Sequence, residues 1–255
     1  MSQAVTWSST YAAIWRSRQQ YLRPVSRLDS IRLESLLGID RQKRLLVENT
    51  ERFLRGELAN NALLWGARGT GKSSIVKALL NAYAEQGMRV VQIDKEDLRD
   101  LPEIVDELIN EPYRFIVFCD DLSFDEGDGT YKALKSILEG SIELPPENVL
   151  IYATSNRRHL MPEYVGDNQQ SHVVDTEIHH AEAIEEKISL SDRFGLWLSF
   201  YAINQEQYLE IVDQLFGSVS NQSAMHTEAI RFATSKGGRS GRAAQQFYKA
   251  YSGKF

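Results

Sequence analysis

Short apolar runs alternate with helical stretches through the middle of this 255-residue chain. Four of the runs, at 61–66, 89–94, 115–120 and 148–156, are apolar along most of their length, and a fifth lies at 196–201. Continuous rather than alternating apolarity is typical of strands that are buried on both faces of a parallel sheet. Because helical patterns separate these runs, the sequence predicts an α/β fold with a doubly wound parallel sheet.

After the fifth run, the pattern is helical to the end of the chain. Asn204 and Gln207 form a capping-box pattern at the start of one helix, and two more helical stretches follow. We therefore expect a small helical domain over 204–255, preceded by an α/β domain over 33–203.

The first residues are also predicted to be helical. Trp7, Tyr11 and Trp15 recur four positions apart, which would place them on one face of a helix. This pattern predicts a helical extension over 1–32. Its aromatic stripe either packs on the protein's own core or docks a partner.

Composition and charge restrict the classes of function. The net charge of -6 and the pI near 5.5 lack the basic excess of proteins that bind polyanions over their whole surface. The start has no signal-peptide core, and no run approaches the roughly 18 apolar residues that a membrane span needs. The single cysteine, Cys119, is expected to be a buried thiol in a reducing cytoplasm.

A glycine-rich turn lies between the first apolar run and the next helical stretch. The segment GARGTGKSS at 66–74 satisfies the pattern G-x-x-x-x-G-K-[ST]. Its glycines permit backbone angles that turn several N–H groups inward at a helix N-terminus, where an anion is favoured. Lys72 can then reach the β and γ phosphates of ATP, and the hydroxyl of Ser73 can ligate Mg²⁺. The predicted phosphate-binding residues are Gly66, Ala67, Arg68, Gly69, Thr70, Gly71, Lys72, Ser73 and Ser74.

Two acidic residues end the third apolar run. Asp120 and Asp121 close the segment FIVFCDD, at the sheet edge where open α/β folds bind ligands. Asp120 is placed to hold Mg²⁺, and Asp121 is placed to polarise a water aimed at the γ phosphate. An acidic pair at a strand end also serves as a helix cap, but together with the glycine-rich turn it favours ATP hydrolysis.

The order of the motifs resembles that of the AAA+ ATPases: the phosphate-binding turn, FIVFCDD, a polar residue that ends IYATSN, then SLSDRFG and GGRSGR. Three segments resemble, more closely, the sequences of a bacterial AAA+ family known only as a domain of unknown function. These segments are NNALLWGARGTGKSS, NVLIYATSNRRHLMPE and EEKISLSDRFGLWLSFY. The resemblance runs from about Leu36 to about Phe247. It implies a parallel sheet of order 5-1-4-3-2, numbered along the chain, and a small helical lid.

The resemblance also implies roles for single residues near the phosphate site. Leu37, Gly38 and Ile39 match the segment that packs on adenine, for which a helix-start turn is the alternative. Asn156 matches sensor 1, a side-chain amide that orients the attacking water together with Asp121. Ordinary turn chemistry at a strand end is the alternative for Asn156.

Two arginine roles are implied in the same way. Arg193 in SDRFG matches the arginine finger that reaches the γ phosphate of a neighbouring subunit, and a solvated ion pair is the alternative. Sensor 2 falls in GGRSGR, on Arg239 or Arg242. We prefer Arg242, which lies at the expected start of the final helix.

The sequence departs from the AAA+ pattern at two places. Most AAA+ proteins end the Walker B strand with Asp-Glu, whereas this chain has Asp120 and Asp121 there. The shorter second side chain predicts slow hydrolysis, which would suit a switch. The stretch at 95–112 lacks the aromatic-hydrophobic-glycine loop with which threading unfoldases grip polypeptide, so a protein-threading motor is not expected.

Two other groups of residues have ordinary explanations. His172, His179 and His180 lie in a polar stretch at 165–187, but their spacing matches no zinc pattern, and we expect no metal other than Mg²⁺. The basic triplet at 157–159 either touches a polyanion or forms a solvated edge.

Together these features predict a cytoplasmic AAA+ ATPase that binds ATP and Mg²⁺ and assembles into a homo-oligomeric ring or filament. It would remodel or load a protein or nucleic-acid client, with no membrane partner. An ATP-dependent assembly switch with slow turnover and a P-loop kinase of a small molecule are the alternatives. A kinase needs neither an arginine from a neighbouring subunit nor a lid of this pattern.

Overall fold

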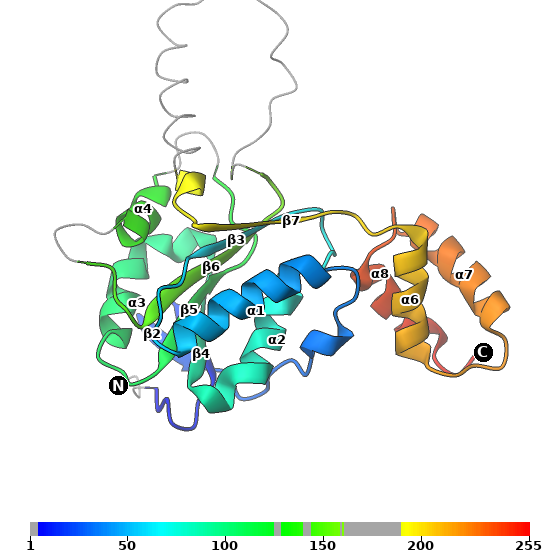
Figure 1. Cartoon of the computed structure of the whole chain (residues 1–255), viewed down its shortest axis with the longest axis horizontal. Coiled ribbons are helices and arrows are strands. Elements are labelled where there is room, and N and C mark those ends of the chain that lie inside the picture. Colours follow the sequence, from blue (N-terminus) through cyan, green and yellow to red (C-terminus); the bar gives the residue numbers. More distant parts are fainter. Residues whose placement is uncertain (1–4, 125–128, 140–143, 159, 161–189) are drawn as a thin grey trace, which may run out of the picture.

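The apolar runs of the sequence form the centre of one sheet. A computed structural model describes residues 5–124, 129–139, 144–158, 160 and 190–255, and within them seven strands form a sheet with helices on both faces (Figure 1). The five predicted strands are β3 (Ala62–Gly66), β4 (Met88–Ile93), β5 (Arg114–Cys119), β6 (Val149–Ser155) and β7 (Leu196–Phe200). Read from β7, their order is β7-β3-β6-β5-β4, which is the expected order 5-1-4-3-2, and neighbouring strands among them are parallel.

The N-terminal residues extend this sheet instead of forming the predicted helix. β1 (Ala12–Arg16) pairs in parallel with β4, and β2 (Tyr21–Pro24) pairs antiparallel with β1. Three aromatic residues over two turns are weak evidence for a helix. The free backbone groups along the edge of β4 need hydrogen-bond partners, and a strand supplies them where a helix does not. The prediction of a helical extension over 1–32 is therefore wrong.

The tryptophans of this segment belong to the core. The ring of Trp7 meets that of Phe115 edge to face, with 4.9 Å between the centroids. The indole of Trp15 donates a hydrogen bond of 2.8 Å to the carboxylate of Asp100. Both tryptophans are buried, so packing within the chain, and not docking to a partner, accounts for them.

Helices cover both faces of the sheet. One face packs against α1 (Asp40–Leu54) and α2 (Lys72–Tyr83), and the other against α3 (Leu101–Leu108) and α4 (Tyr131–Glu139). Successive residues of a strand point to opposite faces, so each central strand contributes to two apolar layers. The described residues also include three short 3₁₀ helices, η1 (Leu33–Ser35), η2 (Ala84–Gln86) and η3 (Lys95–Asp100).

The side chains of Tyr152 and Cys119 are buried in the sheet. The hydroxyl of Tyr152 on β6 lies 3.0 Å from Nδ2 of Asn49 and 2.8 Å from Oγ1 of Thr50, both on α1. Burial raises the pKa of Tyr152 to about 12. Cys119, the last residue of β5, is 1% exposed, which confirms the predicted buried thiol. Burial also raises the pKa of the Cys119 thiol well above its ordinary value.

The C-terminal residues form a separate group of helices. These are α6 (Gln205–Phe216), α7 (Gln222–Ser235) and α8 (Gly241–Tyr251), which pack around an apolar cluster of their own (Figure 1). The predicted capping box is present, because Asn204 and Gln207 exchange hydrogen bonds of 3.0 and 2.9 Å. Within the described ranges, no helix has the length and apolarity required to cross a bilayer.

Candidate functional site

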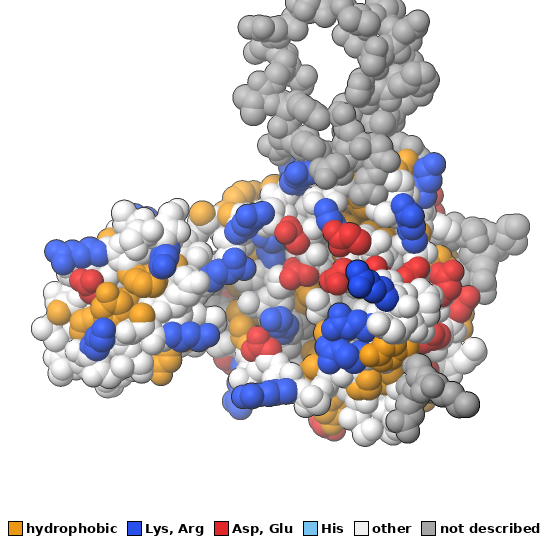
Figure 2. All heavy atoms as spheres, turned by 180° about the vertical axis from the view of Figure 1, so that it is seen from behind, with side chains coloured by type: hydrophobic (Ala, Val, Ile, Leu, Met, Phe, Trp, Pro, Cys, Tyr) orange, Lys and Arg blue, Asp and Glu red, His pale blue; other side chains and the backbone are white. Residues whose placement is uncertain are grey.

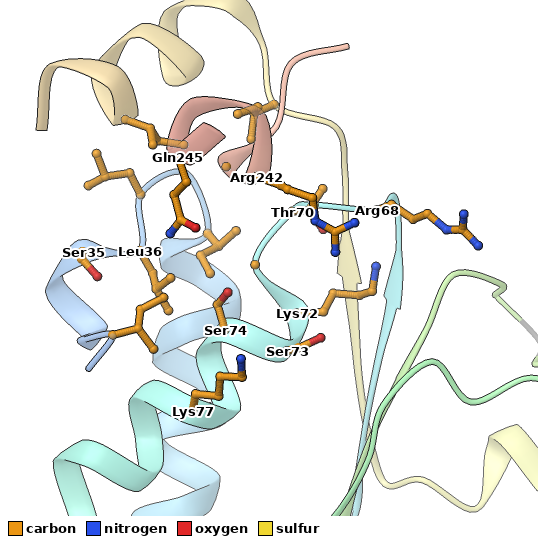
Figure 3. A pocket seen from close by; sticks show the side chains of 18 of the residues that line it. Ser35, Leu36, Arg68, Thr70, Lys72, Ser73, Ser74, Lys77, Arg242 and Gln245 are labelled. Carbon is orange, nitrogen blue, oxygen red and sulfur yellow. The ribbon is translucent and has the colours of Figure 1, made fainter. Parts of the chain in front are cut away.

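A cavity of about 900 Å³ lies where the carboxyl ends of the central strands meet the start of α2. Its walls come from the segment before α1, the turn before α2, and helices α6 and α8. Figure 3 shows Ser35 and Leu36 on one side of the cavity and Lys72 and Ser73 on the other. The cavity therefore has a charged end beside α2 and a more apolar end beside η1.

The glycine-rich turn has the backbone conformation that the sequence requires. Gly66 has a φ of +129°, and a Cβ there would lie 2.0 Å from the carbonyl oxygen of Phe200. Only glycine fits so close to β7. Gly71, with a φ of +97°, begins α2 and makes no side-chain cap. The first N–H groups of α2 are thus without a capping side chain and suited to an anion.

Lys72 is buried against this turn. Its ammonium donates hydrogen bonds of 2.7 Å to the carbonyls of Gly66 and Ala67, and one of 3.1 Å to Oδ1 of Asn156. Burial lowers the pKa of Lys72, and the nearby carboxylates of Asp121 and Asp120 oppose that shift. These neutral partners leave the positive charge of Lys72 available to a phosphate.

Ser73 and Asp120 form a second polar pair at this end. The hydroxyls of Ser73 and Thr154 both donate to Oδ1 of Asp120, over 2.6 and 2.5 Å. Hydroxyl and carboxylate oxygens are the hard donors that Mg²⁺ prefers. The residues predicted to hold Mg²⁺, Ser73 and Asp120, are therefore adjacent and of suitable chemistry.

Asp121 and Asn156 form the third pair. The amide of Asn156 donates to Oδ1 of Asp121, and the backbone N–H of Asp121 donates to Oγ1 of Thr154 over 2.9 Å. Asp121 has a φ of +56°, in the left-handed region that few residues other than glycine adopt. Such backbone conformations cluster at functional sites. Because Asn156 also accepts from Lys72, it joins Asp121 to the glycine-rich turn.

The apolar end includes two of the three residues predicted to contact adenine. Leu37 and Ile39 line the cavity, whereas Gly38, which has a φ of +73°, is not among its lining residues. A Cβ on Gly38 would lie 3.3 Å from the amide nitrogen of Gln207 on α6. The helical lid and the residue before it add lining residues that no sequence motif marks: Ile203, Ile211, Gln214, Leu215 and Gln245.

The two sensor 2 candidates occupy different positions. Arg242, in the first turn of α8, lines the cavity, and Arg239 does not. The start of α8 touches the glycine-rich turn directly, because the N–H of Gly241 donates to the carbonyl of Gly69 over 3.0 Å. A Cβ on Gly69 would lie 2.8 Å from Cβ of Ser240. This contact places the Arg242 side chain beside Lys72.

Arg193 lies at the opposite edge of the sheet. It precedes β7, whose register with β3 puts Leu196 beside Ala62 and Phe200 beside Gly66. The glycine-rich turn follows Gly66, so the five-residue length of β7, about 17 Å, separates Arg193 from the cavity. The guanidinium of Arg193 forms an ion pair with Glu139, at the end of α4.

The remaining sequence candidates lie elsewhere. Arg158 is placed over the ring of Trp65, with 5.6 Å from its guanidinium carbon to the ring centroid. The backbone N–H of Arg157 donates to Oγ of Ser155 over 3.0 Å. His159 and the polar stretch at 165–187, with its three histidines, are outside the described residues. In the described ranges, no three or more His, Cys, Asp and Glu side chains gather into a metal site.

Comparison with solved structures finds proteins to which this chain is similar. Orc1 of Aeropyrum pernix, solved in complex with DNA, is 17% identical, with a TM-score of 0.58 over 84% of this chain and 59% of Orc1. The Holliday junction branch migration motor RuvB of Thermotoga maritima is 13% identical, with a TM-score of 0.46 over 86% of this chain and 72% of RuvB. The fold is that of the AAA+ ATPases. This chain spans less than two thirds of Orc1.

A search among curated proteins finds no match. A family model described as "Protein of unknown function (DUF815)" matches residues 8–255. That match covers nearly the whole chain, including the glycine-rich turn, the acidic pair and the helical lid. The chain therefore belongs to the DUF815 family.

Proposed function

We propose that the protein binds ATP with Mg²⁺ and hydrolyses it. One observation carries this proposal: five polar residues around the start of α2 form one hydrogen-bonded group that is joined through the hydroxyl of Thr154. They are Lys72, Ser73, Asp120, Asp121 and Asn156. The ends of two strands, β5 and β6, and the start of one helix supply these residues. A structural turn needs no such convergence of a buried lysine, an amide and two carboxylates.

The charged end of the cavity fits the phosphates. The N–H groups at the start of α2 and the ammonium of Lys72 bind phosphate oxygens, with Arg242 adding a positive charge from the lid. Ser73 and Asp120 would hold Mg²⁺, which neutralises charge on the β and γ phosphates when it is bound. Leu37, Ile39 and the apolar lid residues would enclose the base.

Asp121 and Asn156 would act on the attacking water. The carboxylate of Asp121 accepts its proton, and the amide of Asn156 fixes the orientation of that carboxylate. Asp121 reaches less far than the glutamate that most AAA+ proteins carry. We therefore propose slow turnover, as in a switch that changes partner binding with the bound nucleotide.

The position of Arg193 supports an assembly of several copies. About 17 Å of sheet separates Arg193 from the cavity of its own chain, so an arginine finger at this position acts only on a neighbouring copy. We propose a homo-oligomeric ring or filament, in the cytoplasm, that remodels or loads a protein or nucleic-acid client. A single free thiol, Cys119, fits a reducing compartment.

ATP binding and turnover without any added acceptor test this function. Lys72→Ala should lose ATP binding, because the phosphate charge is then met by backbone dipoles alone, and should keep its circular dichroism spectrum. Lys249→Ala, which changes a lysine in the last turn of α8 outside the cavity, is the matched control. Equal ATP affinity in Lys72→Ala and the parent would end the proposal. Turnover that appears only with a small-molecule acceptor would identify a kinase instead.

A further inference from the structure

The acidic turn that follows β5 is held from the neighbouring strand β6. The last registered pair of these two strands directly precedes Asp120 and Thr154. The hydroxyl of Thr154 lies 2.5 Å from Oδ1 of Asp120 and 2.9 Å from the backbone nitrogen of Asp121. The carbonyl of Thr154 accepts a hydrogen bond of 2.7 Å from the N–H of Leu122. One residue of β6 therefore contacts three successive residues of the turn.

The direction of the two hydroxyl bonds follows from the groups involved. A backbone N–H only donates and an ionised carboxylate only accepts, so the hydroxyl of Thr154 accepts from Asp121 and donates to Asp120. The branched Cβ of threonine restricts the side chain to few rotamers. Thr154 is 2% exposed, so solvent has little access to replace its hydroxyl. The position thus requires a side chain that donates and accepts through a single atom.

The two carboxylates of the turn have different proposed tasks. Asp120 would hold Mg²⁺ together with Ser73, whose hydroxyl donates to the same Oδ1 over 2.6 Å. Asp121 would accept a proton from the attacking water, and its φ of +56° takes its backbone out of the strand conformation. The hydroxyl of Thr154 joins the carboxylate of the first residue to the backbone of the second. It therefore restricts how the two can move relative to one another.

We propose that Thr154 is a positioning residue that sets the metal-holding and the water-polarising carboxylates relative to one another, which rests on the proposed ATP hydrolysis. Thr154 acts through Asp120 and Asp121 and not on the nucleotide. Residues that orient the ligands of a metal typically contribute about 10- to 100-fold to metal affinity or activity. Loss of this hydroxyl should leave the binding of metal-free ATP unchanged, because Lys72 and the first N–H groups of α2 remain in place.

Thr154→Val tests this role, because valine keeps the shape of the side chain and offers no hydrogen bond. Calorimetric titration of the full chain with a slowly hydrolysed ATP analogue, in EDTA and over a series of Mg²⁺ concentrations, measures binding. Single-turnover hydrolysis over the same series measures the rate. The Mg²⁺ concentration for half-maximal effect should rise about 10- to 100-fold in both measurements, with the parent affinity retained in EDTA. Thr154→Ser, which restores a hydroxyl, should recover the response to Mg²⁺.

Ser155→Ala is the matched control. It removes the next buried hydroxyl of β6, which does not line the cavity, and should keep the parent response to Mg²⁺. Circular dichroism checks folding, and Thr154→Ala replaces Thr154→Val if the valine variant does not fold.

Three results overturn the role of Thr154. These are a parent response to Mg²⁺ in the variant without the hydroxyl, an equal loss in Ser155→Ala, and a loss of affinity in EDTA as large as that in Mg²⁺. The last result would mean that Thr154 supports the whole cavity and not its carboxylates. Failure of the parent to bind the analogue under either condition overturns the proposed function instead.

Discussion

Asp121 combines a short side chain with an unusual backbone. Its φ of +56° turns the chain sharply after β5, and Thr154 and Asn156 hold its N–H and its carboxylate. Three constraints on one residue leave its side chain few alternative positions. The carboxylate is therefore fixed before any substrate arrives, which is what a group that orients water requires.

Asp121→Asn should bind ATP as the parent does and hydrolyse it at least 100-fold more slowly, because the amide keeps the shape and cannot accept a proton. Single-turnover hydrolysis with excess protein, alongside equilibrium binding, separates the two effects. Ser123→Asn, which changes a residue two positions along the same loop, is the control for an added amide. Hydrolysis by Asp121→Asn at the parent rate would show that another group activates the water.

The positions of site residues were predictable from the sequence where the pattern is local. The turn at 66–74 and the acidic pair after β5 each depend on a few adjacent residues, and the structure brings them together as expected. The choice between Arg239 and Arg242 depended on where α8 begins, and only Arg242 lines the cavity. Gln245 escaped sequence reasoning because its position depends on how the lid packs.

At the scale of elements, α1 and β6 are joined through Tyr152. Its hydroxyl contacts Asn49 and Thr50 in a fully buried position, so the aromatic ring and both polar partners lie between helix and sheet. Burial keeps the phenol protonated, and its pKa rises to about 12. An unfolded chain exposes the same phenol to water, where its pKa is about 10.

This difference predicts a loss of stability at alkaline pH. Below pH 10 both states keep the proton, and between about pH 10 and pH 12 only the unfolded state loses it, so unfolding becomes easier as pH rises. Tyr152→Phe should cost about 1 kcal/mol at pH 8, through the lost hydrogen bonds, and less at pH 11. Urea unfolding of both proteins at the two pH values measures this. An equal difference at pH 8 and pH 11 would contradict the explanation.

The N-terminal strands β1 and β2 could not be predicted from local sequence patterns. A four-residue spacing of aromatics is a local signal, whereas the pairing of β1 with β4 joins residues about eighty positions apart along the chain. The five central strands were predictable because their continuous apolarity reports burial on both faces. No comparable sequence pattern indicates which segment pairs with the strand at the edge of the sheet.

At the scale of the whole molecule, the two sheet edges carry different parts of the proposed reaction. The carboxyl edge holds the cavity, and the opposite edge holds Arg193 with Glu139. In the proposed assembly, a second copy would therefore present one edge to the other edge of the first. Contacts of this head-to-tail kind generate a ring if the rotation closes and a filament if it does not.

Mixing two inactive variants tests the shared site. Arg193→Ala should bind ATP normally and hydrolyse it about 10³- to 10⁵-fold more slowly, because the charge on the γ phosphate is no longer stabilised. Lys72→Ala keeps the arginine but lacks nucleotide. Some hydrolysis should return in the mixture, where an intact cavity of one variant meets the arginine of the other. No recovery, although light scattering shows that the variants assemble together, would mean that Arg193 does not act across subunits.

On the face shown in Figure 2, groups of Lys and Arg side chains lie among the Asp and Glu side chains. The net charge is -6, yet Arg68, Lys72 and Arg242 lie at the phosphate end. Local charge and net charge therefore have opposite signs at the proposed site. A triphosphate is therefore attracted over the short range at which the cavity acts.

The burial of Cys119 also determines how the molecule can be labelled with a thiol-reactive fluorophore. The thiolate is the form that reacts with maleimides, and a thiol that is 1% exposed, with its pKa raised by burial, stays almost entirely unreactive in the folded chain. It is the only cysteine in the sequence. A fluorophore attached to a second cysteine, introduced at the exposed position of Leu58, would therefore label one site without removal of the native residue.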